Sequence, residues 1–339
     1  MARQRADTSA PTIRDVAIAA GVARSTVSRV FTRPELLSPE TVTRILALAA
    51  EMGYIPDHTA RSLSTGRRDT IALLVPDIAN PFFPPLIKSV ERYFQARGVA
   101  VLLAETDEEP ELESTLTATL RGRADGVIIA SPRGEADDLI AITGDIPLVL
   151  VNRDIPGTNR VLIDTTTGMR DAVAHLADLG HRRLAYLAGP ERSWSNAERI
   201  KAFLSATRER GLEVTVLPSD RPDYPSGWKS VAAVLESKAT GVIAYDDALA
   251  QGLMAGLSKA GLQVPSDLSV IGCDDLVAPV TVPPMTSIRT SAELAGRKAA
   301  QQLETLLSHP HRRSQERETL IDTLPSSLYI RESTAPPPR

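Results

Sequence analysis

The sequence predicts an α/β chain in which a small all-helical head precedes a two-lobed core of doubly wound parallel sheets. Three observations support this fold class. Residues 12–53 hold three short amphipathic helical patterns. From residue 70, short runs rich in Val, Ile and Leu alternate with helical stretches, which is typical of parallel sheets covered on both faces. The same alternation restarts near residue 182, which indicates a second, similar lobe.

The head begins at Thr12, where "TIRD" predicts a capping box in which Asp15 reaches back to the start of the helix. This helix ends at Gly21, a second helix follows over residues 24–31, and a third begins after Ser38. Two short helices around a tight turn predict a helix-turn-helix.

Charge is unevenly distributed between the head and the core. Residues 1–68 contain ten Arg against six Asp and Glu, a balance of +4, whereas the whole chain carries −4, which leaves −8 for the rest. A basic module on an acidic body favours an anionic partner such as nucleic acid.

The second helix fits duplex DNA for steric reasons. An α-helix fits the major groove, where base edges carry a readable donor and acceptor pattern. Opposite the apolar Val27 and Val30, this helix presents Arg24, Ser25, Ser28 and Arg29. The alternative is a structural bundle whose second helix happens to be basic.

The expected strands are continuous apolar runs that end at polar residues. In the first lobe they are "TIALLVPD", "AVLLAET", "DGVIIASP", "PLVLVNRD" and "RVLID"; in the second they are "RRLAYLAGP", "LEVTVLP", "TGVIAYDD" and "DLSVIGCDD". Ligands of such sheets bind beyond the carboxyl ends of the strands, so a cleft between the lobes would be lined by the residues that end these runs.

The motifs of several enzyme classes are missing from the sequence. It has no GxxxxGK loop, no GxSxG elbow, no GxGxxG after a strand and no paired His at metal-binding spacing, so we expect no catalysis, no metal and no cofactor. The pairs Asp246-Asp247 and Asp274-Asp275 could act as acid and base. Neighbours on a strand point to opposite faces, however, so we expect each pair to supply only one carboxylate to the cleft. Binding of ligand hydroxyls is therefore the preferred interpretation.

Composition also bears on location. No run of about 18 apolar residues could span a bilayer and the first residues lack the apolar stretch of a secretory signal, so we expect a cytoplasmic protein with no membrane partner. The single Cys273 lies in an apolar strand and is expected to be a buried structural residue.

Several spaced motifs resemble those of the lactose repressor (LacI) family of bacterial transcription regulators. They include "TIRDVAIAAGVARSTVSRVF", "SPETVTRILALAAEMGYIP", "ARSLSTGRRDTIALLVPDIANPFF", "DLGHRRLAYLAGP", "VPSDLSVIGCDD" and "PPMTSIRTSAELAG", and the resemblance spans about residues 12–332. It implies a DNA-binding domain over residues 12–57, a hinge over 58–68 and a core over 69–332 that resembles type I periplasmic sugar-binding proteins. Residues 333–339 form a Pro-rich tail that we expect to be disordered. The resemblance further implies a homodimer that represses transcription from a palindromic operator.

The resemblance assigns DNA contacts to three sets of residues. Arg24, Ser25 and Arg29 match the base-reading face of the family's recognition helix. Backbone contacts suit Thr12, Thr26 and Ser28. In the hinge, Leu63 matches a leucine that family dimers wedge into the minor groove, with Ala60 packed beside it.

The resemblance also assigns an effector site in the core. Its expected lining is Asn80, Phe82, Phe83, Arg153, Ser193, Ser195, Arg199, Asp247 and Asp274. Carboxylates and guanidinium groups can grip hydroxyls while an aromatic ring covers a flat face, so we expect a sugar, sugar phosphate or nucleoside. Two alternatives remain open, namely that the Phe residues are only core and that Arg199 is only a surface residue.

Departures from the family pattern concern the cap of the second helix and the cleft. Ala23 stands where Ser or Thr would cap the recognition helix, Asp246 where Asn is frequent, and Thr290 where Gln is frequent.

A solute-binding or sugar-acting protein with an incidental head is the alternative function.

Overall fold

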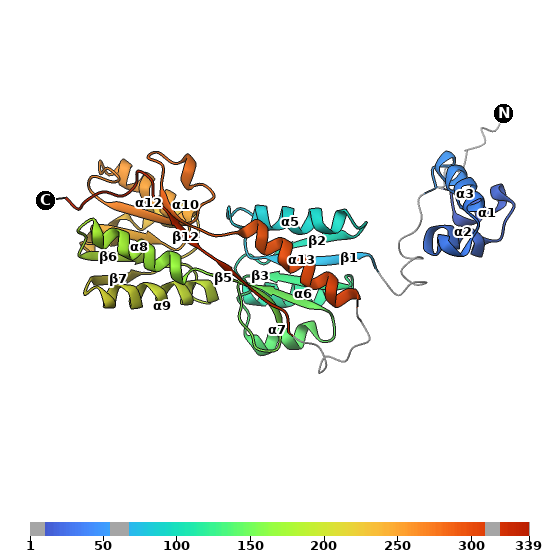
Figure 1. Ribbon diagram of the computed structural model, residues 1–339, viewed down its shortest axis with the longest axis horizontal. Coiled ribbons are helices and arrows are strands. Elements are labelled where there is room, and N and C mark those ends of the chain that lie inside the picture. Colours follow the sequence, from blue (N-terminus) through green and yellow to red (C-terminus); the bar gives the residue numbers. More distant parts are fainter. Residues whose placement is uncertain (1–10, 55–67, 309–318, 339) are drawn as a thin grey trace, which may run out of the picture. The chain divides into compact units, whose positions relative to one another are not determined.

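The computed structural model describes residues 11–54, 68–308 and 319–338. The chain divides into two compact units, Met1–Asp69 and Thr70–Arg339, which are called the head and the core below. Figure 1 shows their elements.

The head is a small helical bundle. Its elements are α1 Ile13–Ala20, α2 Arg24–Thr32, the 3-10 turn η1 Pro34–Leu36 and α3 Pro39–Glu51. Val16, Val27 and Ile45, one from each α-helix, are fully buried at its centre. The apolar positions that predicted the helices are thus the ones that pack together.

The ends of the head helices follow the expected capping residues. The Asp15 carboxylate accepts the Thr12 backbone N–H at 2.8 Å, and Ser38 accepts the Thr41 N–H at 3.3 Å. Gly21 ends α1 with a φ of 65°, a left-handed conformation that favours glycine. Helix α2 follows Ala23 and has no side-chain cap.

Lobe 1 of the core is a six-stranded sheet in the order β11-β5-β4-β3-β1-β2. All of its strand pairs are parallel, with Ile71 of β1 opposite Val101 of β2 and Gly126 of β3. The strands are β1 Thr70–Val75, β2 Ala100–Glu105, β3 Gly126–Ala130, β4 Leu148–Val151, β5 Asn159–Asp164 and β11 Ile321–Pro325; the helices are α5 Phe83–Gln95, α6 Pro110–Arg121, α7 Ala136–Thr143 and α13 Ala292–Ser308.

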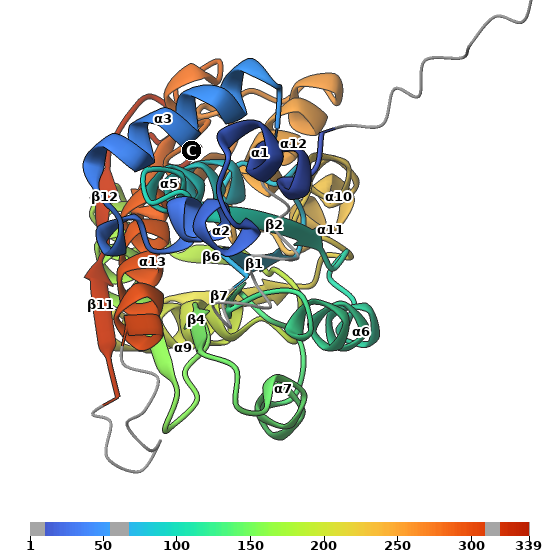
Figure 2. The ribbon, with the colours of Figure 1, turned by 90° about the vertical axis from the view of Figure 1, so that its right-hand side faces the viewer.

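Alternate residues of β1 enter two different cores. Ile71 and Leu73 pack with α5 and α13, whereas Ala72 and Leu74 pack with α6 and α7. The end-on view of Figure 2 shows these two helix layers. Both faces of the central strands are covered, as the continuous apolar strands predict, whereas the edge strand β2 is largely exposed.

Lobe 2 repeats this architecture in the order β12-β10-β9-β8-β6-β7. Only the short β12 runs antiparallel to its neighbour. The strands are β6 Arg183–Leu187, β7 Glu213–Leu217, β8 Gly241–Ala244, β9 Ser269–Asp274, β10 Thr286–Arg289 and β12 Ser327–Tyr329; the helices are α8 Thr166–Asp178, α9 Trp194–Glu209, α10 Tyr224–Lys229, α11 Val231–Glu236 and α12 Asp247–Lys259. Cys273 on β9 is fully buried and forms no disulfide.

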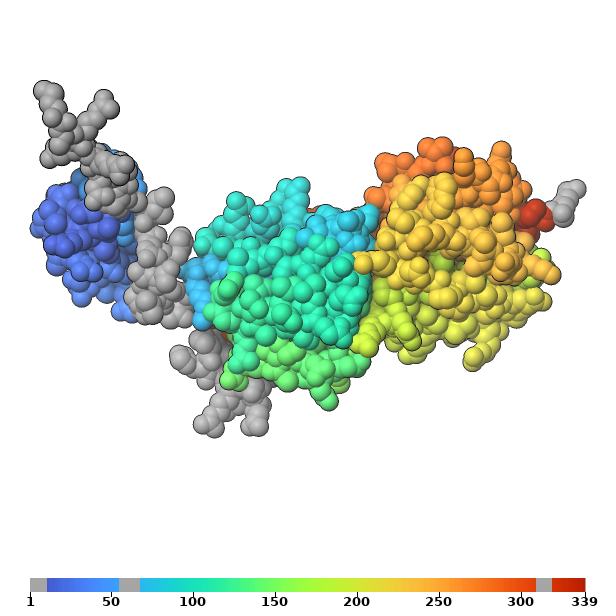
Figure 3. All heavy atoms as spheres, turned by 180° about the vertical axis from the view of Figure 1, so that it is seen from behind, coloured from blue at the N-terminus to red at the C-terminus, as the bar shows by residue number. Residues whose placement is uncertain are grey.

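The chain crosses between the lobes three times. It passes from β5 to α8, from β10 to α13 and from β11 to β12, and the two lobes touch on the face shown in Figure 3. Helix α13 therefore follows lobe 2 in sequence but packs in lobe 1 beside α5. Gly296 allows this close packing, since a Cβ there would lie 2.5 Å from the Leu86 carbonyl oxygen.

The end of the chain corrects one expectation. We expected residues 333–339 to be disordered, but residues 333–335 are bonded to lobe 2. The Ser333 hydroxyl donates to the Val270 carbonyl at 2.5 Å, and the Ala335 carbonyl lies 2.9 Å from Nε2 of His181. The small polar residues before the prolines satisfy backbone groups at the sheet, which the Pro-rich composition concealed.

None of the helices in the described part of the chain has both the length and the apolar character needed to cross a membrane.

Candidate functional site

The head presents a basic face on α2. Arg24, Ser25 and Arg29 are exposed, and Thr26 and Ser28 are partly exposed. Neither Arg24 nor Arg29 forms a side-chain hydrogen bond or ion pair with the described residues, so both cations are available to an outside anion. Thr12, at the start of α1, is also exposed and its hydroxyl donates to Asp15 at 2.7 Å.

Two of the residues expected to contact DNA lie outside the described residues. These are Ala60 and Leu63, together with almost all of the expected hinge over 58–68.

A cavity with about 330 Å³ of space, including its opening, lies between the lobes of the core. Seven of its thirteen lining residues lie at the carboxyl end of a strand or within three residues after it, as expected for parallel sheets. From lobe 1 the lining residues are Asn80, Phe82, Phe83, Glu108, Ser131, Arg133 and Asn152; from lobe 2 they are Ser195, Arg199, Pro222, Tyr245, Asp246 and Asp274.

Six of the nine residues expected to bind an effector line this cavity. They are Asn80, Phe82, Phe83, Ser195, Arg199 and Asp274. The rings of Phe82 and Phe83 meet edge to face, with centroids 5.2 Å apart, and both are also part of the lobe 1 core. Packing in the core and contact with the cavity therefore coexist at these two positions.

The other three expected residues do not line the cavity and bond to neighbouring parts of the core. Arg153 donates to the Gly134 carbonyl at 3.0 Å. The Ser193 hydroxyl caps α9 by accepting the Asn196 N–H at 3.2 Å. Oδ2 of Asp247 accepts the backbone N–H groups of residues 276–278 at 2.8–3.3 Å.

Each acidic pair supplies one carboxylate to the cavity, as expected, but the first pair supplies Asp246 and lies beyond the strand, so alternation along a strand is not the cause. Strand β8 ends at Ala244, and the chain then turns into α12 with Asp246 as its N-cap. Asp247, as the first helical residue, points instead at residues 276–278. The end of the strand decides which carboxylate faces the cavity, and residue spacing alone could not locate it.

Seven lining residues were missed from the sequence, namely Glu108, Ser131, Arg133, Asn152, Pro222, Tyr245 and Asp246. Most follow the ends of β2, β3, β4 and β8, so strand ends were the available signal. Ser131, Asn152 and Asp274 have φ values of 48°, 53° and 100°. Such strained backbone at non-glycine residues is typical of functional sites.

The lobe 2 wall holds a buried charge network. Arg199 lies 3.3 Å from Asp274, donates to the Tyr245 carbonyl, and leaves its Nε without a hydrogen-bond partner in the described structure. The pKa of Asp246 is raised to about 8, chiefly by burial and also by the nearby Asp274 carboxylate. Burial likewise raises the pKa of Asp274, although Arg199 opposes this shift.

Contacts across the cavity join the lobes directly. The Asn80 side-chain amide of lobe 1 donates to the Asp246 carboxylate at 2.9 Å and to the Pro222 carbonyl at 3.2 Å. At the mouth, Arg221 of lobe 2 lies 2.5 Å from Asp107 of lobe 1. A ligand that replaces or adds to these contacts therefore acts on the closure of the two lobes.

The cavity can bind a small polar molecule. Its carboxylates can accept hydrogen bonds from ligand hydroxyls, and its amide and hydroxyl groups can form further hydrogen bonds. Two Phe rings can cover an apolar face of the ligand. Among the described residues no group of three or more His, Cys, Asp or Glu is placed to hold a metal ion.

Comparison with known proteins places both parts of the chain in one family. A model of bacterial regulatory proteins of the lacI family matches residues 12–57, and a model of a periplasmic binding protein-like domain matches residues 173–334. The HTH-type transcriptional regulator DegA of Bacillus subtilis is 31% identical over 336 residues, covering 96% of this chain and 98% of DegA. The chain belongs to the lacI family.

Other known proteins match over a similar share of this chain. The HTH-type transcriptional repressor CytR of Escherichia coli (strain K12) is 31% identical and covers 96% of this chain and 97% of CytR. A crystal structure of the lac repressor dimer bound to operator and an anti-inducer matches with a TM-score of 0.84 at 25% identity, covering 96% of this chain and all of that chain. A CelR–cellobiose complex matches with a TM-score of 0.69 at 30% identity, over 95% of this chain and 99% of that chain.

As a lacI-family member, the protein is a DNA-binding transcription regulator, and its relatives are regulators rather than enzymes. The family assignment confirms the predicted fold class of a helical head and two parallel-sheet lobes.

Proposed function

We propose that this regulator is a homodimeric repressor that binds a palindromic operator through α2 and is controlled by a small sugar-like or nucleoside-like effector in the cavity between the lobes. The observation that carries the proposal is the cavity itself, because both lobes contribute polar side chains to it. The lac repressor dimer on its operator and the CelR–cellobiose complex support the two halves of the proposal.

The effector acts through lobe closure. A ligand shifts a conformational equilibrium only by its differential affinity for the two states. In this structure Asn80 and Arg221 already form bonds across the two lobes. An effector that favours or opposes this closure changes how the two hinges of a dimer are spaced and ordered, and so changes operator affinity.

Arg24, Ser25 and Arg29 read base edges in this proposal, while Thr12, Thr26 and Ser28 contact the backbone. The paired Leu63 residues, supported by Ala60, enter the minor groove at the operator centre. The hinge spans 58–68 between the DNA-binding domain of 12–57 and the core of 69–332. Operator DNA is in the cytoplasm of a bacterium, which is where the protein works.

The test is selection of an operator from random duplex DNA by the full chain, followed by titration of that operator with and without ribose, cellobiose and cytidine. We expect one palindromic site, one dimer per site, and an affinity that changes with a ligand that also raises the core melting temperature. An operator affinity that no core-binding ligand alters would refute the control mechanism. Operator binding that survives Arg29→Ala and Leu63→Ala together would refute the DNA contacts.

A further inference from the structure

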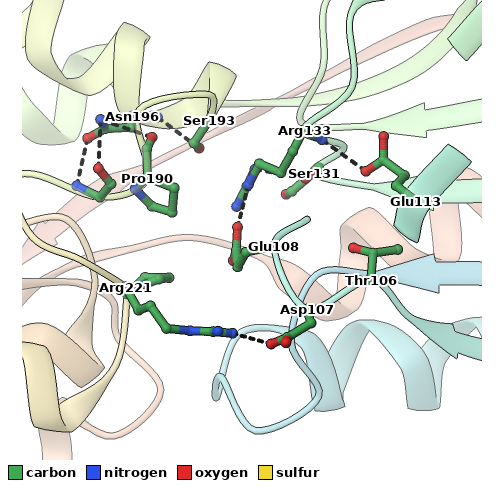
Figure 4. Close-up of polar contacts among 12 residues, drawn as sticks. Thr106, Asp107, Glu108, Glu113, Ser131, Arg133, Pro190, Ser193, Asn196 and Arg221 are labelled. Carbon is green, nitrogen blue, oxygen red and sulfur yellow. Dashed lines mark hydrogen bonds and ion pairs between the residues drawn. The ribbon is translucent and has the colours of Figure 1, made fainter. Parts of the chain in front are cut away.

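The lobe 1 wall of the cavity contains a second buried arginine, Arg133, with its own carboxylate. Arg133 is 3% exposed. Its Nε lies 2.5 Å from the Glu108 carboxylate and its Nη1 donates to the Ser131 carbonyl at 2.8 Å. Figure 4 shows the pair facing the space between the lobes.

The backbone beneath Arg133 is also held in place. Glu113, from α6, accepts the backbone N–H groups of Arg133 at 2.9 Å and of Gly134 at 3.0 Å. The guanidinium is therefore fixed at the cavity wall by contacts within lobe 1. It is preorganised to bind an anion, but Glu108 already pairs with its Nε.

Both guanidinium groups of the cavity are neutralised in the same way. Arg199 is paired with Asp274 and Arg133 is paired with Glu108. Asp246 adds a carboxyl group without a cationic partner among the described residues, and burial raises its pKa to about 8. The outer part of the cleft is acidic as well, since its lining holds six carboxylates and three arginines. Of those arginines, Arg192 is exposed and solvated, so salt screens its attraction for an anion.

We propose, building on the proposed function, that Glu108 sets the charge selectivity of this cavity: by neutralising Arg133 it makes the site accept an uncharged hydroxyl-rich effector and reject its phosphorylated or carboxylated counterpart. An anion that binds Nε of Arg133 must displace Glu108 and lie close to Asp274 and to the carboxylates of the cleft mouth. An uncharged polyol donates hydroxyls to those carboxylates without breaking either ion pair.

The central experiment uses inorganic phosphate as the probe, so that it does not depend on knowing the effector. Calorimetric titration of the full chain at constant ionic strength compares the wild type with Glu108→Gln. We expect phosphate to bind Glu108→Gln at least about tenfold more tightly than the wild type, because the freed Arg133 gains a charge-assisted hydrogen bond. Adding Arg133→Ala to Glu108→Gln should abolish the gain.

The matched control is Glu109→Gln, which removes the same charge from the neighbouring, exposed residue at the mouth without touching Arg133. Its phosphate affinity should stay within about threefold of the wild type, since an exposed charge is screened. Equal gains in phosphate affinity in the two variants would show that the overall negative charge at the mouth sets the affinity, and would overturn the role of Glu108. Wild-type binding of phosphate that Arg133→Ala abolishes would overturn the proposal outright.

A second measurement compares ribose with ribose 5-phosphate, and adenosine with AMP, by thermal shift. Any stabilisation of the wild type should come from the uncharged member of a pair, and Glu108→Gln should shift the preference toward the phosphorylated member. Wild-type preference for a phosphorylated member would refute the selectivity. Operator binding by each variant is measured in parallel, and its loss would instead point to a fault in the fold or in the proposed regulatory function.

Discussion

The head and the core of this regulator use their charged residues in opposite ways. In the head, Arg24 and Arg29 are exposed and make no side-chain pair with the described residues. In the core, Arg199 and Arg133 are buried and each is bonded to a carboxylate. Exposed cations suit a polyanion such as DNA, whose binding salt weakens, whereas buried pairs suit a small ligand that must fit an existing hydrogen-bond network.

The largest expected effect is on core stability. Arg199→Met removes the partner of Asp274 in the cavity wall, and breaking a buried pair costs about 3–5 kcal/mol. Arg29→Met in the head should change stability by less than about 0.5 kcal/mol, because the side chain is exposed. Urea unfolding followed by circular dichroism measures both. Similar losses in the two variants would contradict the contrast between buried and exposed arginines.

For operator binding, substitution of Arg29 should have a larger effect than substitution of Arg199. Arg29→Ala should weaken operator binding by about 1–3 kcal/mol and make its salt dependence shallower by about one unit of slope if the side chain contacts phosphate. Arg199→Met should leave the salt slope unchanged, since no DNA contact is lost. Fluorescence anisotropy at several salt concentrations measures both quantities. An unchanged affinity and slope for Arg29→Ala would remove this residue from the interface.

The pH dependence of stability should arise in the core. Asp246 has a folded-state pKa of about 8, raised by burial from 3.8. The folded state therefore binds more protons than the unfolded state between these values, and the unfolding free energy falls as pH rises, by at most about 1.4 kcal/mol per pH unit for one proton. Asp246→Asn should flatten the decline between pH 6 and 8, whereas Asp220→Asn, at the exposed mouth, should not. A decline of equal steepness in Asp246→Asn would exclude Asp246 as its source.

A substitution in the head should produce a smaller change, namely a gain in stability. Ala23 precedes α2 without a side-chain cap, so Ala23→Ser should stabilise the head by about 1 kcal/mol. Differential scanning calorimetry of the full chain should show only the head transition move. Ala23→Val, which supplies no hydroxyl, is the control and should give no gain.

The smallest effect concerns the mouth of the cleft. Arg221 and Asp107 are 40% and 59% exposed in their side chains, and exposed ion pairs contribute about 0–1 kcal/mol. Arg221→Gln should therefore lower core stability by no more than this amount and by less at high salt, as measured by urea unfolding. A loss of stability as large as that of Arg199→Met would show that the ion pair between Arg221 and Asp107 holds the two lobes together.

The fold was predictable because local patterns agree with tertiary structure over most of the chain. Apolar runs such as "DGVIIASP" became buried parallel strands, and Ser38 caps α3 as its position before Pro39 predicts. The placement of α13 in lobe 1 was not predictable, because its amphipathic pattern says that it packs but not which sheet it covers. The order of residues 333–335 was missed for a similar reason, since their partners lie far away in sequence.

The sequence by itself determined that this protein has a basic helix-turn-helix head, two parallel-sheet lobes and polar residues at the strand ends, because helix and strand periods, capping residues and charge are local properties. Only the tertiary structure decided that Asp246 rather than Asp247 lines the cavity, and that Glu108 neutralises Arg133 there. Those outcomes depend on where a strand stops and on which side chains a folded wall brings within hydrogen-bond distance, and neither quantity is encoded in residue spacing alone.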